Sequence, residues 1–198
     1  MTKKRAMSYA LLLAGSLSLP IAAAPPSIAR PAGMGAAAFA LSSTAFTNGG
    51  TIPKVHECTT DGRNDPRQKN ESPPLAWSGA PAAAKSYAIV MRDLDNQNLI
   101  HWVIYDIPVS ATSLPQNVEH VYQPATPAGA RQVYYRGSAK LFGYQGPCSP
   151  STVNTYEFVV HALNRQSLTE LTESSSTQTA ARAITNASVG SAKITGES

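Results

Sequence analysis

Three side chains with acid-base chemistry stand close together in the middle of the chain. Asp93 and Asp95 follow the apolar run SYAIVMR (86–92), and His101 lies near the start of a second apolar run, LIHWVIYDIP (99–108). Both runs are dense in β-branched and aromatic residues, which is typical of buried strands. A polar connection, DLDNQN, joins them. The pattern therefore predicts two carboxylates and one imidazole at the same end of a β-structure.

Several chemistries are open to this trio. The carboxylates and a protonated imidazole could hold a neutral or cationic head group, and the same groups are also ligands for divalent metals. An aspartate could instead orient His101 as a general base for a serine nucleophile. The plain alternative is a solvated loop beside one hydrogen-bonded core histidine. The sequence holds no G-x-S-x-G, His-Glu-x-x-His or P-loop motif that would favour an enzyme.

The N-terminus has the layout of a secretory signal peptide. Three basic residues, KKR (3–5), precede an apolar stretch from Tyr9 to Leu19, and small residues follow Pro20. We predict a signal peptide over 1–24, a flexible Ala/Pro/Gly linker over 25–38 and a single domain over 39–198. The expected location is the periplasm or the exterior. The apolar stretch is shorter than the roughly 20 residues of a spanning helix, so no transmembrane span is predicted.

Charge and cysteine content exclude two further classes of function. From Pro31 onward twelve basic residues face twelve acidic ones, which argues against nucleic acid as a partner. Cys58 and Cys148 are the only two cysteines, and in an exported protein they are expected to form a disulfide. Two isolated cysteines lack the spacing of a zinc site. The sequence predicts neither a metal nor a cofactor.

The rest of the chain predicts short strands and little helix. Fifteen prolines and thirteen glycines divide it into short pieces. Strands are expected over Phe39 to Phe46, in TYEFVVHAL (155–163) and in ASVGSAKIT after Asn186, and one helix over Ser176 to Thr185 with a serine cap. The long connections within 110–150 are candidates to build a site. The fold class is therefore mostly β with one or two short helices.

The remaining histidines and one tryptophan have plain interpretations. His161 alternates within a strand and is predicted to be structural. His56 and His120 are predicted to be surface residues in loops. Trp102 follows His101 directly and is expected on the opposite face of the strand, in the core.

Four motifs in order resemble the phosphatidylethanolamine-binding protein family. They are SPPLAWSGAP (72–81), RDLDNQNLIHWVIYDIP (92–108), GYQGPCSP (143–150) and TYEFVVHALN (155–164). The bacterial branch, often called Raf kinase inhibitor-like, is the nearer match, and the similarity extends from about Phe39 to Gly196. The resemblance implies a β-sandwich of two sheets, a small anion-accepting pocket at one edge and no established catalytic activity.

The resemblance also assigns ligand-binding residues. Asp93 and Asp95 match the two acids of the family's Asp-Pro-Asp-Ala-Pro motif, and His101 matches its pocket histidine. Further positions of the implied pocket are Gly146, Pro147, Asn154, Tyr156 and Trp77.

Two departures from the family pattern affect this pocket. Leu94 and Gln97 stand where the acidic loop has prolines, which predicts a freer loop. Asn154 and Thr155 stand where the family has His and Arg. Without that cation an anion is expected to bind more weakly, because charge-assisted hydrogen bonds are the stronger ones.

The resulting expectation is an exported, non-catalytic binding protein whose small pocket takes an anionic ligand or a phospholipid head group. One alternative is an inhibitor of a secreted peptidase or of another protein partner, because relatives in this family inhibit enzymes. A further alternative is a hydrolase that uses Asp93, Asp95 and His101.

Overall fold

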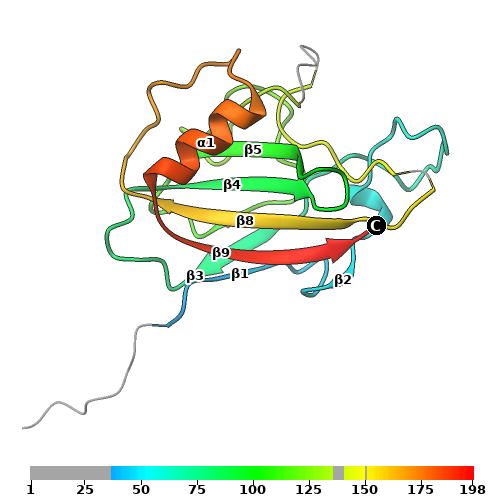
Figure 1. The fold of residues 1–198 in the computed structure, drawn as a ribbon, viewed down its shortest axis with the longest axis horizontal. Helices are drawn as coiled ribbons and strands as arrows, with labels where there is room; N and C mark the ends of the chain where they lie inside the picture. Colours follow the sequence, from blue (N-terminus) through cyan, green and yellow to red (C-terminus); the bar gives the residue numbers. More distant parts are fainter. Residues whose placement is uncertain (1–36, 136–140, 150) are drawn as a thin grey trace, which may run out of the picture. The chain divides into compact units, whose positions relative to one another are not determined.

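A six-stranded sheet forms the centre of the described fold (Figure 1). The computed structural model describes residues 37–135, 141–149 and 151–198. The predicted signal peptide and all but the last two residues of the predicted linker lie outside these ranges. The strands stand in the spatial order β2 (Gly50–Thr51), β9 (Ser188–Glu197), β8 (Thr155–Leu163), β4 (Ser86–Asp93), β5 (Leu99–Pro108) and β7 (Arg131–Gln132). Among these described strands β2 and β9 pair in parallel, and the other neighbours pair antiparallel.

A smaller sheet packs on one face of the large one. Its strands are β1 (Ala40–Ser42), β3 (Leu75–Ser78) and β6 (Ser113–Leu114). The core between the sheets includes Leu41 and Trp77 from the small sheet and Met91, Trp102 and Phe158 from the large sheet. The two-sheet, mostly β fold class predicted from the sequence is confirmed.

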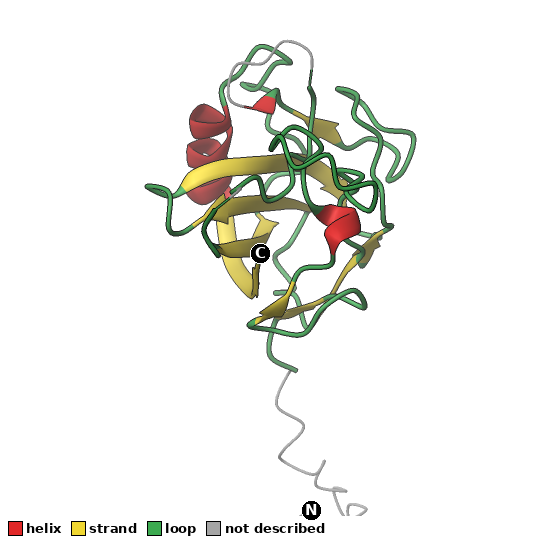
Figure 2. Cartoon of the chain, turned by 90° about the vertical axis from the view of Figure 1, so that its right-hand side faces the viewer, coloured by secondary structure: helices red, strands yellow, loops and turns green. Residues whose placement is uncertain are grey.

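The helix α1 (Thr177–Ala187) covers the other face of the large sheet (Figure 2). Ser176 caps it, because its hydroxyl accepts a hydrogen bond from the backbone N–H of Thr179 at 3.1 Å. Ala180 and Ile184 of the helix pack against Val90 and Val103 of the sheet. The predicted helix and serine cap are therefore confirmed.

The strands β4 and β5 are buried on both faces. Along β4, Ile89 and Met91 belong to the core between the sheets, whereas Ala88 and Val90 belong to the core under α1. This double burial explains why their sequences are apolar throughout instead of alternating with polar residues. The strand predicted over 39–46 is shorter than expected, since only Ala40–Ser42 pairs.

A tight turn joins β4 to β5. Gln97 and Asn98 both have left-handed backbone conformations, with φ of 51° and 55°, and the N–H of Leu99 donates to the carbonyl of Asn96 at 2.9 Å. Two successive left-handed residues inside this bond are the pattern of a type I′ hairpin turn. Proline is fixed near φ −65°, so it does not fit position 97 in this turn. The polar loop therefore has the backbone pattern of a type I′ turn in place of the family's proline-containing turn.

The disulfide between Cys58 and Cys148 joins two irregular segments, residues 56–72 and 143–149, with 5.3 Å between the Cα atoms. The N–H of Cys58 also donates to the carbonyl of Pro147 at 2.9 Å. The short 3-10 helix η1 (Lys54–His56) leads into the first segment, and the Tyr144 hydroxyl donates to the carbonyl of His56 at 2.8 Å. The predicted disulfide is present, and it holds the two segments together at one end of the large sheet.

Candidate functional site

Asp93, His101 and Tyr156 meet at one end of the large sheet. Asp93 ends β4 and pairs with Tyr156 near the start of β8. His101 is the third residue of β5. Its ring centroid is 5.3 Å from that of Tyr156 in an edge-to-face arrangement. Antiparallel pairing of β4 with both neighbours brings these ends together, so residues 55 positions apart in the chain are in contact.

A β-bulge decides where His101 points. Met91 pairs with Trp102 but Arg92 pairs with Ile100, which makes His101 the extra residue of β5. A bulge breaks the alternation of side chains and re-aims the residue within it. His101 consequently contacts Tyr156, whose ring belongs to the core between the two sheets. Trp102 is fully buried in that same core, as predicted, but the expected strict alternation between the two residues does not hold.

The imidazole of His101 is held in one tautomer. Its Nδ1 lies 3.0 Å from the backbone carbonyl oxygen of Gln145, and a carbonyl oxygen can only accept, so Nδ1 carries the proton. The ring is 2% exposed and also packs on Tyr135, with 5.6 Å between ring centroids.

The carboxylates of the two aspartates accept hydrogen bonds from backbone N–H groups. Asp93 is buried, and its Oδ1 accepts from the N–H groups of Asp95 and Asn96 at 3.0 and 3.1 Å. Its Oδ2 accepts from Asn154 Nδ2 at 2.8 Å. Asp95 is exposed, and its Oδ2 accepts from the N–H of Thr155 at 2.6 Å. Both carboxylates therefore link the connection after β4 to Asn154 and Thr155 at the start of β8.

Tyr156 keeps its proton at neutral pH. Burial raises the pKa of its hydroxyl, the hydrogen bond with Ser149 lowers it, and the nearby negative charge of Asp93 raises it, with a net increase. The Ser149 hydroxyl lies 3.4 Å from the Tyr156 oxygen. The group is thus a neutral hydroxyl that can donate one hydrogen bond.

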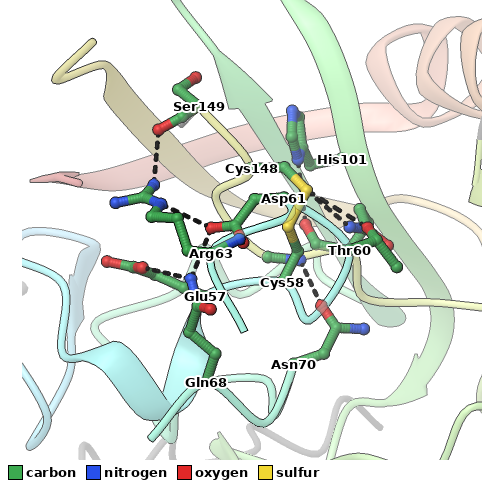
Figure 3. The surroundings of a disulfide bond; sticks show 12 residues. Glu57, Cys58, Thr60, Asp61, Arg63, Gln68, Asn70, His101, Cys148 and Ser149 are labelled. Atoms are coloured by element: carbon green, nitrogen blue, oxygen red, sulfur yellow. Dashed lines mark hydrogen bonds and ion pairs between the residues drawn. A yellow bond between two sulfur atoms is a disulfide. The ribbon is translucent and has the colours of Figure 1, made fainter. Parts of the chain in front are cut away.

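Gly146 and Pro147 form a wall against the 56–72 segment. A Cβ atom at Gly146 would overlap the carbonyl oxygen of His56, so only glycine allows this approach of the two backbones. Figure 3 shows His101 and the disulfide of Cys58 and Cys148 in this region. A cavity of about 440 Å³ lies beside the wall, lined by Thr59, Thr60, Asn70, Tyr135, Leu141, Gln145 and Cys148.

One predicted pocket position, Trp77, lies elsewhere, and Thr155, which stands where the family has Arg, faces away from the site. Trp77 is in β3 of the small sheet and packs edge-to-face on Tyr87 at 5.3 Å, at the end of β4 opposite to Asp93. Six residues of strand correspond to roughly 20 Å, so the structure does not bring Trp77 to this site. Thr155 directly precedes Tyr156 and faces the opposite side of β8. Asn154 and Thr155 are the two residues that differ from the family's His and Arg. Of these two, Asn154 is the one whose side chain contacts Asp93.

Two of the other three histidines, His56 and His120, differ from their surface interpretation. His56 is 1% exposed, and its Nδ1 lies 2.8 Å from the carbonyl oxygen of Glu71, so the prediction of a surface residue is wrong. His120 is half-buried, and its two ring nitrogens lie 3.0 and 3.2 Å from the carbonyl oxygens of Phe142 and Asn70. His161 is buried on the face of β8 opposite to Tyr156, as its structural interpretation predicts.

The residues 37–135, 141–149 and 151–198 hold no cluster of three or more His, Cys, Asp or Glu side chains arranged to bind a metal ion. Within the same ranges no helix has the length and hydropathy needed to cross a bilayer.

Sequence reasoning missed Asn70, whose side-chain amide binds main-chain groups of Tyr144 and Gly146, and Gln145, whose carbonyl binds His101. Asn70 lies two positions before the motif that begins at Ser72, but a lone asparagine in a polar loop gives no signal of its own. Gln145 lies inside the motif GYQGPCSP, and its contribution is a carbonyl oxygen, which every residue type has.

Comparisons with known proteins agree with the motifs. The family model described as phosphatidylethanolamine-binding protein matches residues 42–198. A UPF0098 protein of Methanothermobacter thermautotrophicus is 35% identical over 158 residues, covering 79% of this chain and 95% of the relative. LppC of Mycobacterium tuberculosis, which carries the word lipoprotein in its name, is 28% identical over 158 residues, covering 79% of this chain and 70% of the relative.

Solved structures show the same fold. The crystal structure of Escherichia coli YbcL, described as a new member of the mammalian PEBP family, superposes with a TM-score of 0.70 at 25% identity and covers 80% of this chain and 96% of YbcL. A Chlamydia trachomatis homolog of the phosphatidylethanolamine-binding proteins gives a TM-score of 0.64 at 25% identity, with 81% and 97% of the two chains covered. The ordered motifs, the two-sheet fold and the family match over 42–198 establish that the chain belongs to the phosphatidylethanolamine-binding protein family.

Proposed function

We propose that this protein is an exported, non-catalytic binding protein that takes a small phosphate-bearing anion beside His101. The observation that carries the proposal is the arrangement of this imidazole. Its Nδ1 is fixed by the Gln145 carbonyl, and its ring packs against Tyr135 and Tyr156. A ring fixed in this way loses little conformational entropy when a ligand binds.

The cavity beside this arrangement has the size of a small-molecule site. Its volume of about 440 Å³ lies within the range of roughly 300–1,000 Å³ that is usual for ligand pockets. Two of its lining residues, Tyr135 and Gln145, also contact His101. A phosphate or phosphoethanolamine molecule in the cavity would therefore lie close to the imidazole.

The charges near His101 favour an anion only weakly. The Asp93 carboxylate lies close to Tyr156, and three N–H groups already donate to its oxygens. The imidazole adds a positive charge when it is protonated, which for histidine occurs near physiological pH. We expect affinity on the order of millimolar, or about 4 kcal/mol, and stronger binding at lower pH.

The hydrogen bonds of the trio argue against hydrolysis. In a Ser-His-Asp relay the aspartate accepts a hydrogen bond from the histidine. Here Nδ1 of His101 donates to the carbonyl of Gln145 instead. Both aspartates accept from N–H groups of the β4–β5 connection and of the start of β8. The contact of the Ser149 hydroxyl is with Tyr156. These contacts support a role in binding rather than in catalysis.

Calorimetric or NMR titration with inorganic phosphate and with phosphoethanolamine tests the proposal. Wild type is compared at about pH 5.5 and about pH 8 with His101→Asn, because the asparagine amide can still donate to the Gln145 carbonyl but cannot be charged. We expect the variant to bind more weakly and to lose the pH dependence. The matched control, His161→Gln, changes a buried histidine on the opposite face and should bind as wild type does. Tight binding that is independent of pH and unaffected by His101→Asn would contradict the proposal.

The export part of the proposal rests on the N-terminal sequence and on the relative named as a lipoprotein. Mass spectrometry of the protein from its native host should find a mature N-terminus between Ala24 and Arg30. Intact Met1 in the soluble cytoplasmic fraction would contradict export.

A further inference from the structure

The side-chain amide of Asn70 binds the wall segment on both sides of Gln145. Its Oδ1 accepts from the N–H of Gly146 at 2.8 Å, and its Nδ2 donates to the carbonyl of Tyr144 at 3.2 Å. One amide group thus pairs with the wall backbone in the way that a neighbouring strand would. Figure 3 shows Asn70 and His101 on different sides of the disulfide region.

His101 binds the same piece of backbone from the other side. The N–H of Gln145 donates to the carbonyl of His101 at 3.2 Å, and Nδ1 of His101 donates to the carbonyl of Gln145 at 3.0 Å. Gln145, which directly precedes Gly146 of the wall, therefore lies between the Asn70 amide and the first residues of β5.

A single peptide group couples the two side chains. The carbonyl of Gln145 and the N–H of Gly146 belong to one planar unit and point in opposite directions. Asn70 holds the N–H of that unit and His101 is bound to its carbonyl. Turning the peptide group would break both hydrogen bonds, so the position of Asn70 determines where the acceptor for His101 lies.

Asn70 is itself fixed by its backbone. Its φ is 57°, a left-handed conformation that asparagine and glycine adopt more readily than other residues. Its N–H donates to the carbonyl of Glu57 at 2.9 Å, and its carbonyl oxygen lies 3.2 Å from Nε2 of His120. The neighbouring disulfide at Cys58 limits how far this segment can move.

We propose that Asn70 is a positioning residue, which fixes the Gln145–Gly146 peptide group and through it the Nδ1-protonated tautomer and orientation of His101. The effect on the ring does not require a ligand. The effect on anion affinity rests on the proposed function.

Two variants separate the side chain from the backbone. Asn70→Gly keeps the left-handed conformation and removes both side-chain hydrogen bonds. Asn70→Asp has nearly the same size and keeps an acceptor for Gly146 but loses the donor to Tyr144. The matched control is Asn64→Gly, which changes another left-handed asparagine, with φ of 53°, in an exposed loop.

The first measurement is the NMR spectrum of the imidazole nitrogens at about pH 8, which distinguishes the two neutral tautomers. Wild type and Asn64→Gly should show His101 protonated at Nδ1. Asn70→Gly should show a mixture of tautomers, and Asn70→Asp a smaller change in the same direction. An unchanged His101 spectrum in folded Asn70→Gly, with only a lower melting temperature, would reduce Asn70 to a structural role and overturn the proposal.

The second measurement is titration of the same variants with inorganic phosphate. Asn70→Gly loses the hydrogen bonds that fix the Gln145–Gly146 peptide group. If this loss is equivalent to about one net hydrogen bond, the affinity for phosphate should fall about fivefold. If the tautomer changes but wild type does not bind phosphate, the positioning role stands and the proposed function fails. If wild type binds phosphate and the His101 tautomer is the same in all variants, the proposed function stands and the positioning role fails.

Discussion

His56, His101 and His161 are each less than a tenth exposed. In His56 and His101 the Nδ1 nitrogen lies 2.8 and 3.0 Å from a backbone carbonyl oxygen. In His161 it donates to the Ser188 hydroxyl, which in turn donates to the carbonyl of Gly190. Burial disfavours the charged form of imidazole, and it lowers the pKa of both His56 and His161.

At the residue scale, His161 should make stability depend on pH. Burial and the nearby charge of Arg92 lower its pKa to about 4, against the opposing effect of Glu157. Unfolded histidine titrates near 6.5, so the unfolded chain takes up the proton first as the pH falls. The stabilising contribution is therefore complete above about pH 6.5 and is lost toward pH 4, by about 3 kcal/mol.

Urea denaturation of wild type and His161→Gln at about pH 7 and about pH 4.5 measures this contribution. The free energy of unfolding should fall less with pH in the variant, since glutamine does not titrate. Carboxylates and His56 titrate in both proteins, so the difference between them isolates His161. Equal pH dependence in the two proteins would refute the assignment.

At the scale of elements, Asp93 joins the end of β4 to the start of β8. Its carboxylate accepts from the N–H groups of Asp95 and Asn96 in the β4–β5 connection and from the amide of Asn154. Asn154 also exchanges backbone hydrogen bonds with Ser198 after β9, at 2.8 and 3.1 Å. One buried carboxylate thus connects the β4–β5 turn with the segments that precede β8 and follow β9.

Asp93→Asn should destabilise the fold because one oxygen acceptor becomes an N–H₂ donor that faces the Asn154 amide. Hydrogen bonds to a charged group contribute roughly 1.5–3 kcal/mol, so we expect a loss of about 2 kcal/mol in the free energy of unfolding. The control is Asp95→Asn, at an exposed position with one backbone partner, for which less than about 0.5 kcal/mol is expected. Chemical denaturation measures both, and equal losses would contradict the special position of Asp93.

At the scale of the whole molecule, the disulfide closes a long covalent loop. Cys58 and Cys148 are 90 residues apart, and the loop between them contains β3, β4, β5, β6 and β7. A cross-link of this span restricts the unfolded chain more than a short one does.

Cys58→Ser combined with Cys148→Ser should lower the free energy of unfolding by about 4 kcal/mol, from the loop-closure entropy of roughly 90 residues. Denaturation of the double variant and of oxidised wild type gives the difference. Reduced wild type serves as the control and should match the double variant. If oxidised and reduced wild type have the same stability, the disulfide does not stabilise the fold.

The strands and the helix follow from local sequence. The apolar runs at 86–92 and 99–108 became β4 and β5, because residues that are apolar on both faces need a sheet position buried on both faces. The serine before 177–187 became the cap of α1. The pairing of two cysteines was also predictable, since no other partner exists in the chain.

The site depended on tertiary structure. The bulge at His101 comes from the register with β4, and strict alternation in the sequence would have pointed the side chain elsewhere. The sequence predicted that the carboxylates of Asp93 and Asp95 bind a ligand. In the structure they accept hydrogen bonds from N–H groups of the β4–β5 connection and of the start of β8.

The sequence by itself determined the family, the strand and helix segments and the disulfide, because these depend on residue type and on neighbours along the chain. Only the tertiary structure decided the orientation of His101 and the role of Asn70. The hydrogen bond from Gly146 to Asn70 spans 76 residues, and that from His101 to Gln145 spans 44. In each of these bonds one partner is a main-chain group, which nearly every residue type has, so the side-chain pattern of the sequence does not indicate which residues will pair.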